Sequence, residues 1–266
     1  MKSYALLAIL GCAAGNLLAQ EPKPAAGQRT FASPEEAISA LRTAESARDK
    51  GGLRAIFGPE FDQLLTGDHV QDAKNEEKFS AKLTASCNAV PEGSDKVVLE
   101  IGTNNWPMPI PLVKSDGQWH FDTAAGKEEI VIRHIGKDEL HAIAICHAYA
   151  REQHLGANVD DAAVVPHPTH GYYFRVLTRQ GPAAPGGKKD YVHDGRFADG
   201  FALLAYPQHW DKSGVMTFMA GQDGVVYERD LGVNTARVAR KIKEYNPGND
   251  WNRVQEEGIL SADTEQ

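Results

Sequence analysis

The sequence predicts an α+β protein in two parts, each with helices followed by antiparallel strands. A helix-start signal at Ser33 and a long helical pattern over residues 127–155 mark the helical segments. Asp116-Gly117 and Asp223-Gly224 each stand between two strand-like runs, which is a strong hairpin signal. Helical segments that precede antiparallel strands are typical of the α+β class.

Residues 1–19 have the pattern of a signal peptide. Lys2 gives a basic start, an apolar run follows, and Ala19 is a small residue at the expected cleavage point. The apolar run is shorter than the roughly 20 residues that span a bilayer. We therefore expect a protein that leaves the cytoplasm, for the periplasm or the exterior, without an integral membrane segment.

An alternative leader type remains open at Cys12. Ile9-Leu10-Gly11-Cys12 loosely resembles a bacterial lipobox, in which the cysteine is lipidated and becomes the new N-terminus. Leu10 is bulky where a small residue is usual, so cleavage after Ala19 is favoured. Both alternatives imply export.

The first predicted domain covers residues 31–125, after a polar, Pro-rich lead over residues 20–30. Ser33-Pro34-Glu35-Glu36 forms a capping box with proline at the first helical position. The helix ends at Gly51-Gly52, and a further helix is expected over residues 72–86. Strands are then expected over the ranges 96–101, 108–114 and 118–121.

The second predicted domain covers residues 126–250 and begins with the helix over residues 127–155. Strands follow over residues 172–178, 201–206, 215–220 and 225–229. Asn234 is expected to cap a basic helix that reaches about Tyr245. Residues 251–266 are polar and are expected to form a loose tail.

The charge and cysteine content exclude some classes of protein. The formal net charge of −8 argues against a nucleic-acid partner, which requires a basic surface. After signal cleavage only Cys87 and Cys146 remain, so the fold depends on a conventional hydrophobic core. These two cysteines can form one disulfide in an oxidising compartment, although their spacing does not show that they are close.

Four sequence blocks carry a family resemblance, and together they extend over nearly the whole mature chain. They start at Phe31 (FASPEEA), Trp119 (WHFDTAAG), Gly171 (GYYFR) and Gly200 (GFALLAYP). They resemble the bacterial family catalogued as domain of unknown function 2950. The resemblance implies an exported bacterial protein, and it implies no activity and no catalytic residues.

Two architectural resemblances are weaker. The N-terminal part is similar to nuclear-transport-factor-2-like or cystatin-like domains, which often hold an apolar pocket. The C-terminal part resembles the soluble head of a type IV pilin, but it lacks the prepilin cleavage motif and the long apolar N-terminal helix. Fold analogy alone does not assign a function.

The histidines are the candidate metal ligands. His134, His141, His147 and His154 lie on the predicted long helix at spacings of seven, six and seven. A helical chelate needs ligands one turn apart, so neither His134 with His141 nor His147 with His154 can hold one ion alone. His167 and His170 form a closer pair on a loop and are our candidate metal ligands. They need a third ligand, for which Asp160, Asp161, His193 and Asp194 are candidates by residue type.

The sequence predicts no catalytic and no cofactor-binding residues. Ser213 lacks the Gly-x-Ser-x-Gly nucleophile motif, and Cys146 cannot easily use the adjacent His147 as a base on a helix. The favoured function is therefore a non-enzymatic periplasmic or cell-surface binding or assembly module, with another envelope protein or a small ligand as partner. The alternatives are a ligand-binding or hydrolytic pocket in the N-terminal domain, or a histidine-based metal protein.

Overall fold

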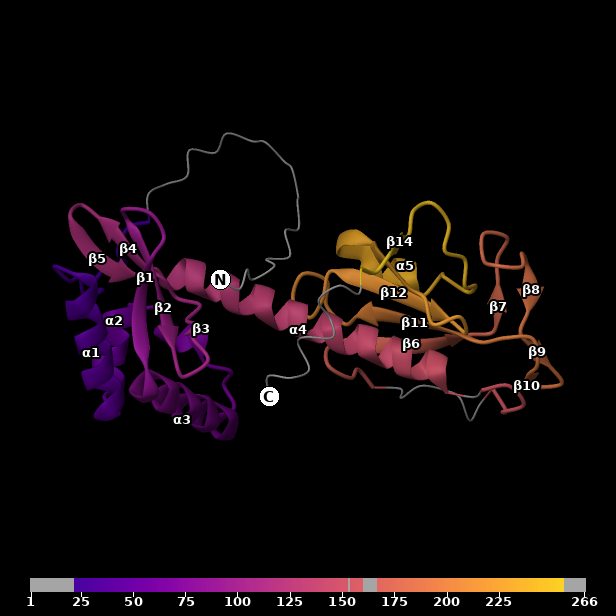
Figure 1. Ribbon diagram of the computed structural model, residues 1–266, viewed down its shortest axis with the longest axis horizontal. Coiled ribbons are helices and arrows are strands. Elements are labelled where there is room, and N and C mark those ends of the chain that lie inside the picture. Colours follow the sequence, from indigo (N-terminus) through magenta and orange to yellow (C-terminus); the bar gives the residue numbers. More distant parts are fainter. Residues whose placement is uncertain (1–21, 153, 160–166, 256–266) are drawn as a thin grey trace. The chain divides into compact units, whose positions relative to one another are not determined.

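The computed structural model describes residues 22–152, 154–159 and 167–255, and it confirms an α+β fold with antiparallel sheets. The predicted signal peptide and Cys12 lie outside the described residues. The chain divides into two compact units between Val131 and Ile132, inside helix α4 (Thr123–Arg151). We call residues 22–131 the N-terminal unit and residues 132–255 the C-terminal unit. Both are visible in Figure 1.

Three helices and one turn of 3-10 helix form the helical part of the N-terminal unit. They are α1 (Pro34–Ser46), α2 (Lys50–Phe57), η1 (Phe61–Leu64) and α3 (His69–Ala85). The predicted serine cap is confirmed at α1, since the Glu36 amide donates to Ser33 Oγ over 3.3 Å. The Glu36 carboxylate in turn accepts from the Ala32 amide at 2.9 Å. Helix α3 begins three residues earlier than predicted because the Asp68 carboxylate accepts from the amides of Val70 and Gln71.

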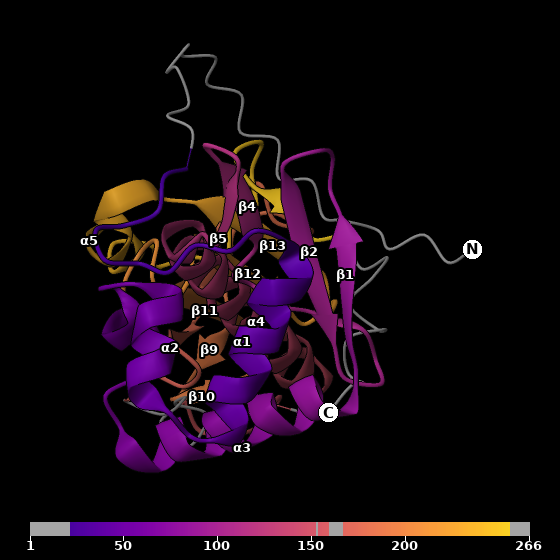
Figure 2. The same ribbon diagram turned by 90° about the vertical axis from the view of Figure 1, so that its left-hand side faces the viewer.

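The N-terminal sheet has the strand order β1-β2-β4-β5, with β3 paired to the end of β2. Its strands are β1 (Cys87–Pro91), β2 (Lys96–Ile101), β3 (Trp106–Pro107), β4 (Leu112–Ser115) and β5 (Gln118–Phe121). Asp116 and Gly117 have φ values of 50° and 80°, as expected for a two-residue hairpin turn. Helices α1 and α2 contact β5, and α3 contacts β1 and β2 (Figure 2). Leu41, Leu83, Leu99 and Phe121 lie in the core between these helices and the sheet.

The C-terminal sheet has the strand order β14-β13-β12-β11-β6 and is antiparallel throughout. Its strands are β6 (Tyr172–Leu177), β11 (Ala202–Pro207), β12 (Met216–Gly221), β13 (Val226–Asp230) and β14 (Asn252–Arg253). Ala142, Cys146 and Tyr149 of α4 lie in one core with Tyr172, Leu204 and other residues of these strands. This packing fixes which face of α4 is turned toward the sheet.

Two short ribbons extend the C-terminal unit. They pair β7 (Arg179–Gln180) with β8 (Lys189–Asp190), and β9 (Val192–His193) with β10 (Arg196–Phe197). The ribbon β9–β10, like the ribbon β7–β8, was not among the predicted elements. Its turn is a further Asp-Gly pair, with Asp194 at φ 49° and Gly195 at φ 74°.

The predicted basic C-terminal helix is wrong in its extent. The structure has η2 (Gly232–Asn234) followed by α5 (Thr235–Ala239), and Asn234 makes no side-chain cap. The Arg175 guanidinium donates to the carbonyl oxygens of Ala239, Arg240 and Ile242, so the chain beyond α5 bonds to a strand residue. Tyr245 then pairs with β7 instead of continuing a helix.

The predicted loose tail also begins with ordered structure. Asn252 and Arg253 form the edge strand β14, and Val254 is buried and donates its amide to the Val226 carbonyl at 2.9 Å. Residues 256–266 lie outside the described part. Within the part of the chain that the structure describes, no helix is both long and apolar enough to cross a membrane.

Candidate metal centre

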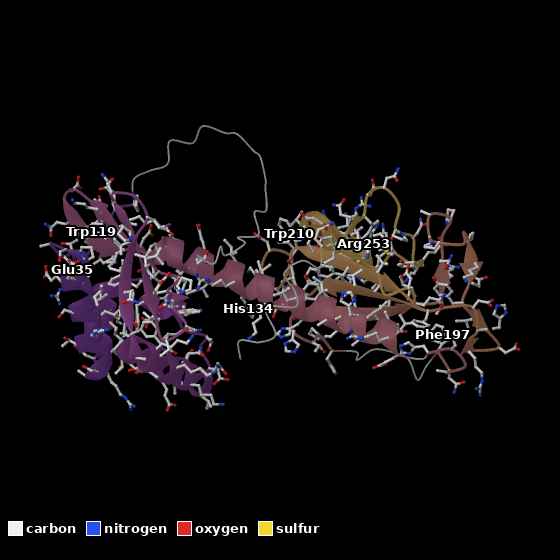
Figure 3. The ribbon with its side chains drawn as sticks, in the orientation of Figure 1. Glu35, Trp119, His134, Phe197, Trp210 and Arg253 are labelled. Atoms are coloured by element: carbon white, nitrogen blue, oxygen red, sulfur yellow. The ribbon has the colours of Figure 1, made fainter. Side chains whose placement is uncertain are left out.

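Two potential ligands lie three residues apart on helix α4. Asp138 is buried, with 5 % of its surface exposed, and His141 is half-buried. Residues at this spacing lie on the same face of a helix. His134, one turn before Asp138, directs Nε2 to within 3.3 Å of Asp138 Oδ2 and lies on the exposed side of α4 (Figure 3).

The third potential ligand is His170, which lies in the turn before β6. Thr169 and Tyr172 exchange both backbone hydrogen bonds, at 2.8 and 3.0 Å, so His170 and Gly171 form a two-residue turn. Both have positive φ, at 46° and 69°. The His170 ring stacks on the His141 ring with centroids 4.0 Å apart.

Gly171 allows this turn to approach the helix. A Cβ atom at this position would lie 2.6 Å from Asp138 Oδ2 and 2.7 Å from Ser213 Cβ. Ser213 Oγ donates to the Gly171 carbonyl at 2.9 Å, and the Gln208 amide donates to the same oxygen at 2.8 Å. Two hydrogen bonds to the Gly171 carbonyl therefore hold the turn in place.

Glu139 fixes the helix against the sheet beside the candidate ligands. Its Oε1 atom accepts from the amides of Val215 and Met216, at 2.8 and 2.9 Å. These amides stand at the start of β12. Because Glu139 follows Asp138 directly, these two bonds restrict the rotation of α4 at the position where Asp138 and His141 meet the turn.

One ligand atom from each of Asp138, His141 and His170 lies within 4.8 Å of the others. Around a tetrahedral zinc ion, with bonds of about 2.1 Å, ligand atoms are about 3.4 Å apart. The ligand atoms therefore need to approach each other by at most about 1.4 Å. His170 can supply most of this movement because it is exposed, whereas Asp138 is enclosed.

Only one of the ligands predicted from the sequence belongs to the group that the structure brings together. His170 belongs to the group, whereas His167 is exposed on the segment before the turn and is not part of it. His193 bonds to Asp199 over 2.8 Å, and Asp194 lies in the β9–β10 turn. Asp160 and Asp161 lie outside the described residues. The spacing Asp138-x-x-His141 is the sequence signal for this group, and spacings between histidines alone do not contain it.

Cys146 and Ser213 have structural roles in the C-terminal unit. Cys87 lies in the N-terminal unit and Cys146 in the C-terminal unit, both as free cysteines, and their pairing in a disulfide stays a prediction. Cys146 is fully enclosed, and burial raises the pKa of its thiol to about 12, so it is not a nucleophile at neutral pH. Ser213 holds the Gly171 turn, as described above.

The fold and the His-His-Asp group define a two-unit α+β protein with a candidate metal centre in its C-terminal unit. A family model described as a protein of unknown function (DUF2950) matches residues 28–165 and 155–254, and the chain belongs to this family. No curated protein and no solved structure matches the chain. The resemblances to a pilin head and to nuclear-transport-factor-2-like domains therefore stay predictions.

Proposed function

We propose that the protein is an exported, non-enzymatic binding module that holds a divalent transition-metal ion with Asp138, His141 and His170. The observation that carries this proposal is the approach of these ligand atoms to within 4.8 Å of one another. Imidazole nitrogen and carboxylate oxygen are ligands of zinc and its neighbours in the first transition row. The signal-peptide pattern of residues 1–19 supports export.

The surroundings of the group favour metal binding over a purely structural contact. A stack of two neutral imidazoles needs neither a buried carboxylate nor a glycine that admits it. Here Gly171 leaves room for Asp138 directly under the turn that carries His170. His134 contacts the Oδ2 atom of the same carboxylate, as outer partners of metal ligands do.

The proposal includes no catalysis by a side-chain nucleophile, because the nucleophile candidates of this unit are committed to structure. Cys146 is enclosed in the core, and Ser213 Oγ bonds to the Gly171 carbonyl. Three protein ligands leave one position of a tetrahedral ion open for water or for a donor from a partner. A partner in the envelope that offers one further side chain would complete this coordination.

Isothermal titration calorimetry of the mature chain with Zn²⁺ tests the proposal. We expect one ion per chain, and an affinity at least about 100-fold lower in His141→Gln and His170→Gln, since losing an outer partner alone costs about 10- to 100-fold. His193→Gln is the matched control, because it removes an exposed histidine that also bonds to a carboxylate. Equal zinc affinity in all four proteins would refute the proposal.

A further inference from the structure

A polar pocket in the N-terminal unit lies between helices α1 and α3 and shares no residue with the candidate metal centre. Its volume is about 320 Å³, at the lower end of the range for small-molecule sites. Five hydroxyl side chains, one aliphatic residue and two charged residues line it, namely Ser39, Thr43, Ser46, Ser80, Thr84, Leu83, Arg42 and Glu45.

Glu45 is the unusual member of this lining. Only 8 % of its surface is exposed, and its Oε2 atom is buried without a hydrogen-bond partner. Burial, together with the negative charge of Glu76 on α3, raises the pKa of Glu45 from 4.5 to about 7. A buried carboxyl group without a partner is costly, and a bound donor would remove that cost.

Arg42 supplies the opposite charge in the same pocket. It stands three residues before Glu45 on α1, and therefore on the same helix face. It also lies near Cys87, where burial raises the pKa of the thiol and the Arg42 charge partly offsets the rise. Among the residues that the structure describes, neither Arg42 nor Glu45 forms an ion pair.

The hydroxyl groups of α1 point to a ligand that donates hydrogen bonds. Thr43 Oγ1 donates to the Ser39 carbonyl at 2.8 Å, and Ser46 Oγ donates to the Thr43 carbonyl at 3.0 Å. Because each hydroxyl hydrogen is used inside the helix, the oxygen lone pairs remain as acceptors toward the pocket. These acceptors and the Glu45 carboxylate suit an ammonium group.

We propose that this pocket binds a small zwitterion, such as a free amino acid, with its ammonium group on Glu45 and its carboxylate on Arg42. A guanidinium group holds a carboxylate through two parallel hydrogen bonds. A ligand with only one charge would leave either Arg42 or Glu45 unmatched. This inference is independent of the metal centre, because every residue that carries it lies in the N-terminal unit.

The affinity of this pocket for a zwitterion should depend on pH. The ammonium group requires ionised Glu45, and the charged group that acts on Glu45 is Glu76 on α3. Arg42 lines the same pocket and interacts with Cys87. With a pKa of about 7 in the empty pocket, the ionised fraction rises about tenfold from pH 6 to pH 8. The affinity should rise by about the same factor, since only the competent fraction binds.

Amide chemical-shift titrations of the mature chain with L-serine test this inference. We expect saturable shifts at Ser39, Thr43, Ser80 and Thr84, with binding at least about tenfold weaker in Glu45→Gln and in Arg42→Gln. Glu77→Gln, which changes an exposed glutamate on α3, is the control and should bind as the unchanged chain does. Methylammonium and acetate, which each carry one of the two charges, should bind at least about tenfold more weakly than serine.

Three results would overturn the inference. They are the absence of shifts with serine, glycine and alanine alike, equal binding of methylammonium and serine, and unchanged binding in Glu45→Gln. Glu45→Gln removes a buried charge, so its thermal unfolding temperature at pH 8 should not fall, and this confirms that the variant is folded. Loss of zinc binding in the C-terminal unit would leave all of these results unaffected.

Discussion

The imidazole rings of His141 and His170 stack with centroids 4.0 Å apart, although they are 29 residues apart in sequence and belong to different elements. The first is on helix α4 and the second is in the turn that opens β6. Their contact brings both nitrogen ligands over the buried Asp138 carboxylate. The proposed metal centre therefore depends on how closely the turn approaches the helix.

Replacing Gly171 tests how closely the turn before β6 approaches helix α4. In Gly171→Ala the new Cβ would lie 2.6 Å from Asp138 Oδ2, and the alanine would also have to adopt φ 69°. We expect a loss of roughly 3 kcal/mol or more in the free energy of unfolding, measured by urea denaturation, because a steric clash adds to backbone strain of about 1–2 kcal/mol.

Gly187→Ala is the matched control for this substitution. Its φ is 75°, and a Cβ atom added there would have no other atom within 4 Å. It should cost about 1–2 kcal/mol, from backbone strain alone. Equal losses in the two variants would contradict the claim that contacts with Asp138 and Ser213 limit position 171.

His134 should act on the metal through Asp138. Its Nε2 atom is 3.3 Å from Asp138 Oδ2, and its side chain is largely exposed. In His134→Gln we expect zinc affinity to fall by about tenfold, the lower end for an outer partner, because exposure weakens the contact. Competition with a chromophoric chelator measures this change. A loss as large as that of His141→Gln would instead make His134 a direct ligand.

Glu139 should stabilise the junction of α4 with β12. Its carboxylate accepts two backbone amides, and hydrogen bonds to a charged group contribute about 1.5–3 kcal/mol. Glu139→Ala should therefore lower the free energy of unfolding of the C-terminal unit by at least about 2 kcal/mol. Glu139→Gln keeps one amide oxygen as acceptor and should lose less. If urea denaturation shows that Glu139→Ala and Glu139→Gln lower the free energy of unfolding equally, these two hydrogen bonds contribute little.

Glu45 should make the stability of the N-terminal unit depend on pH. Its pKa is raised by folding from 4.5 to about 7, so the folded chain retains a proton that the unfolded chain loses in this interval. The contribution is fully present below pH 4.5 and disappears as the pH rises through 7, with a total of at most about 3 kcal/mol. Denaturation curves from about pH 4 to about pH 8 measure it.

Glu45→Gln is the comparison for this pH profile. An amide does not titrate, so the variant should lack the fall between pH 4.5 and about pH 7 that Glu45 causes. Its stability relative to the unchanged chain should therefore increase with pH across this interval. Parallel profiles for the two proteins would show that the Glu45 carboxyl group titrates normally in the folded state.

Local signals predicted much of the fold. The range 96–101 matches β2, and Asp116-Gly117 makes the predicted hairpin, because strand alternation and positive-φ turns depend on nearby residues. Strand β1 was missed because its residues are mostly exposed and show no apolar alternation. The shortness of α5 also escaped prediction, since the Arg175 side chain that bonds to its last carbonyls comes from a distant strand.

The candidate site was predicted only in part, because it too depends on contacts between residues that are distant in sequence. His170 stood out because it forms a close pair with His167 on a loop just before a predicted strand. Its contacts, Asp138 and His141, are defined by the packing of a turn on a helix that is about 30 residues away in sequence. Histidine spacing on one helix carries no information about such a contact.

The most direct measurement is anomalous diffraction at the zinc absorption edge from crystals of the mature chain grown with Zn²⁺. We expect an anomalous peak about 2.1 Å from one ligand atom each of Asp138, His141 and His170. The central claim would be contradicted if this group had no peak and the zinc ion were bound elsewhere, for example by His193 and Asp199.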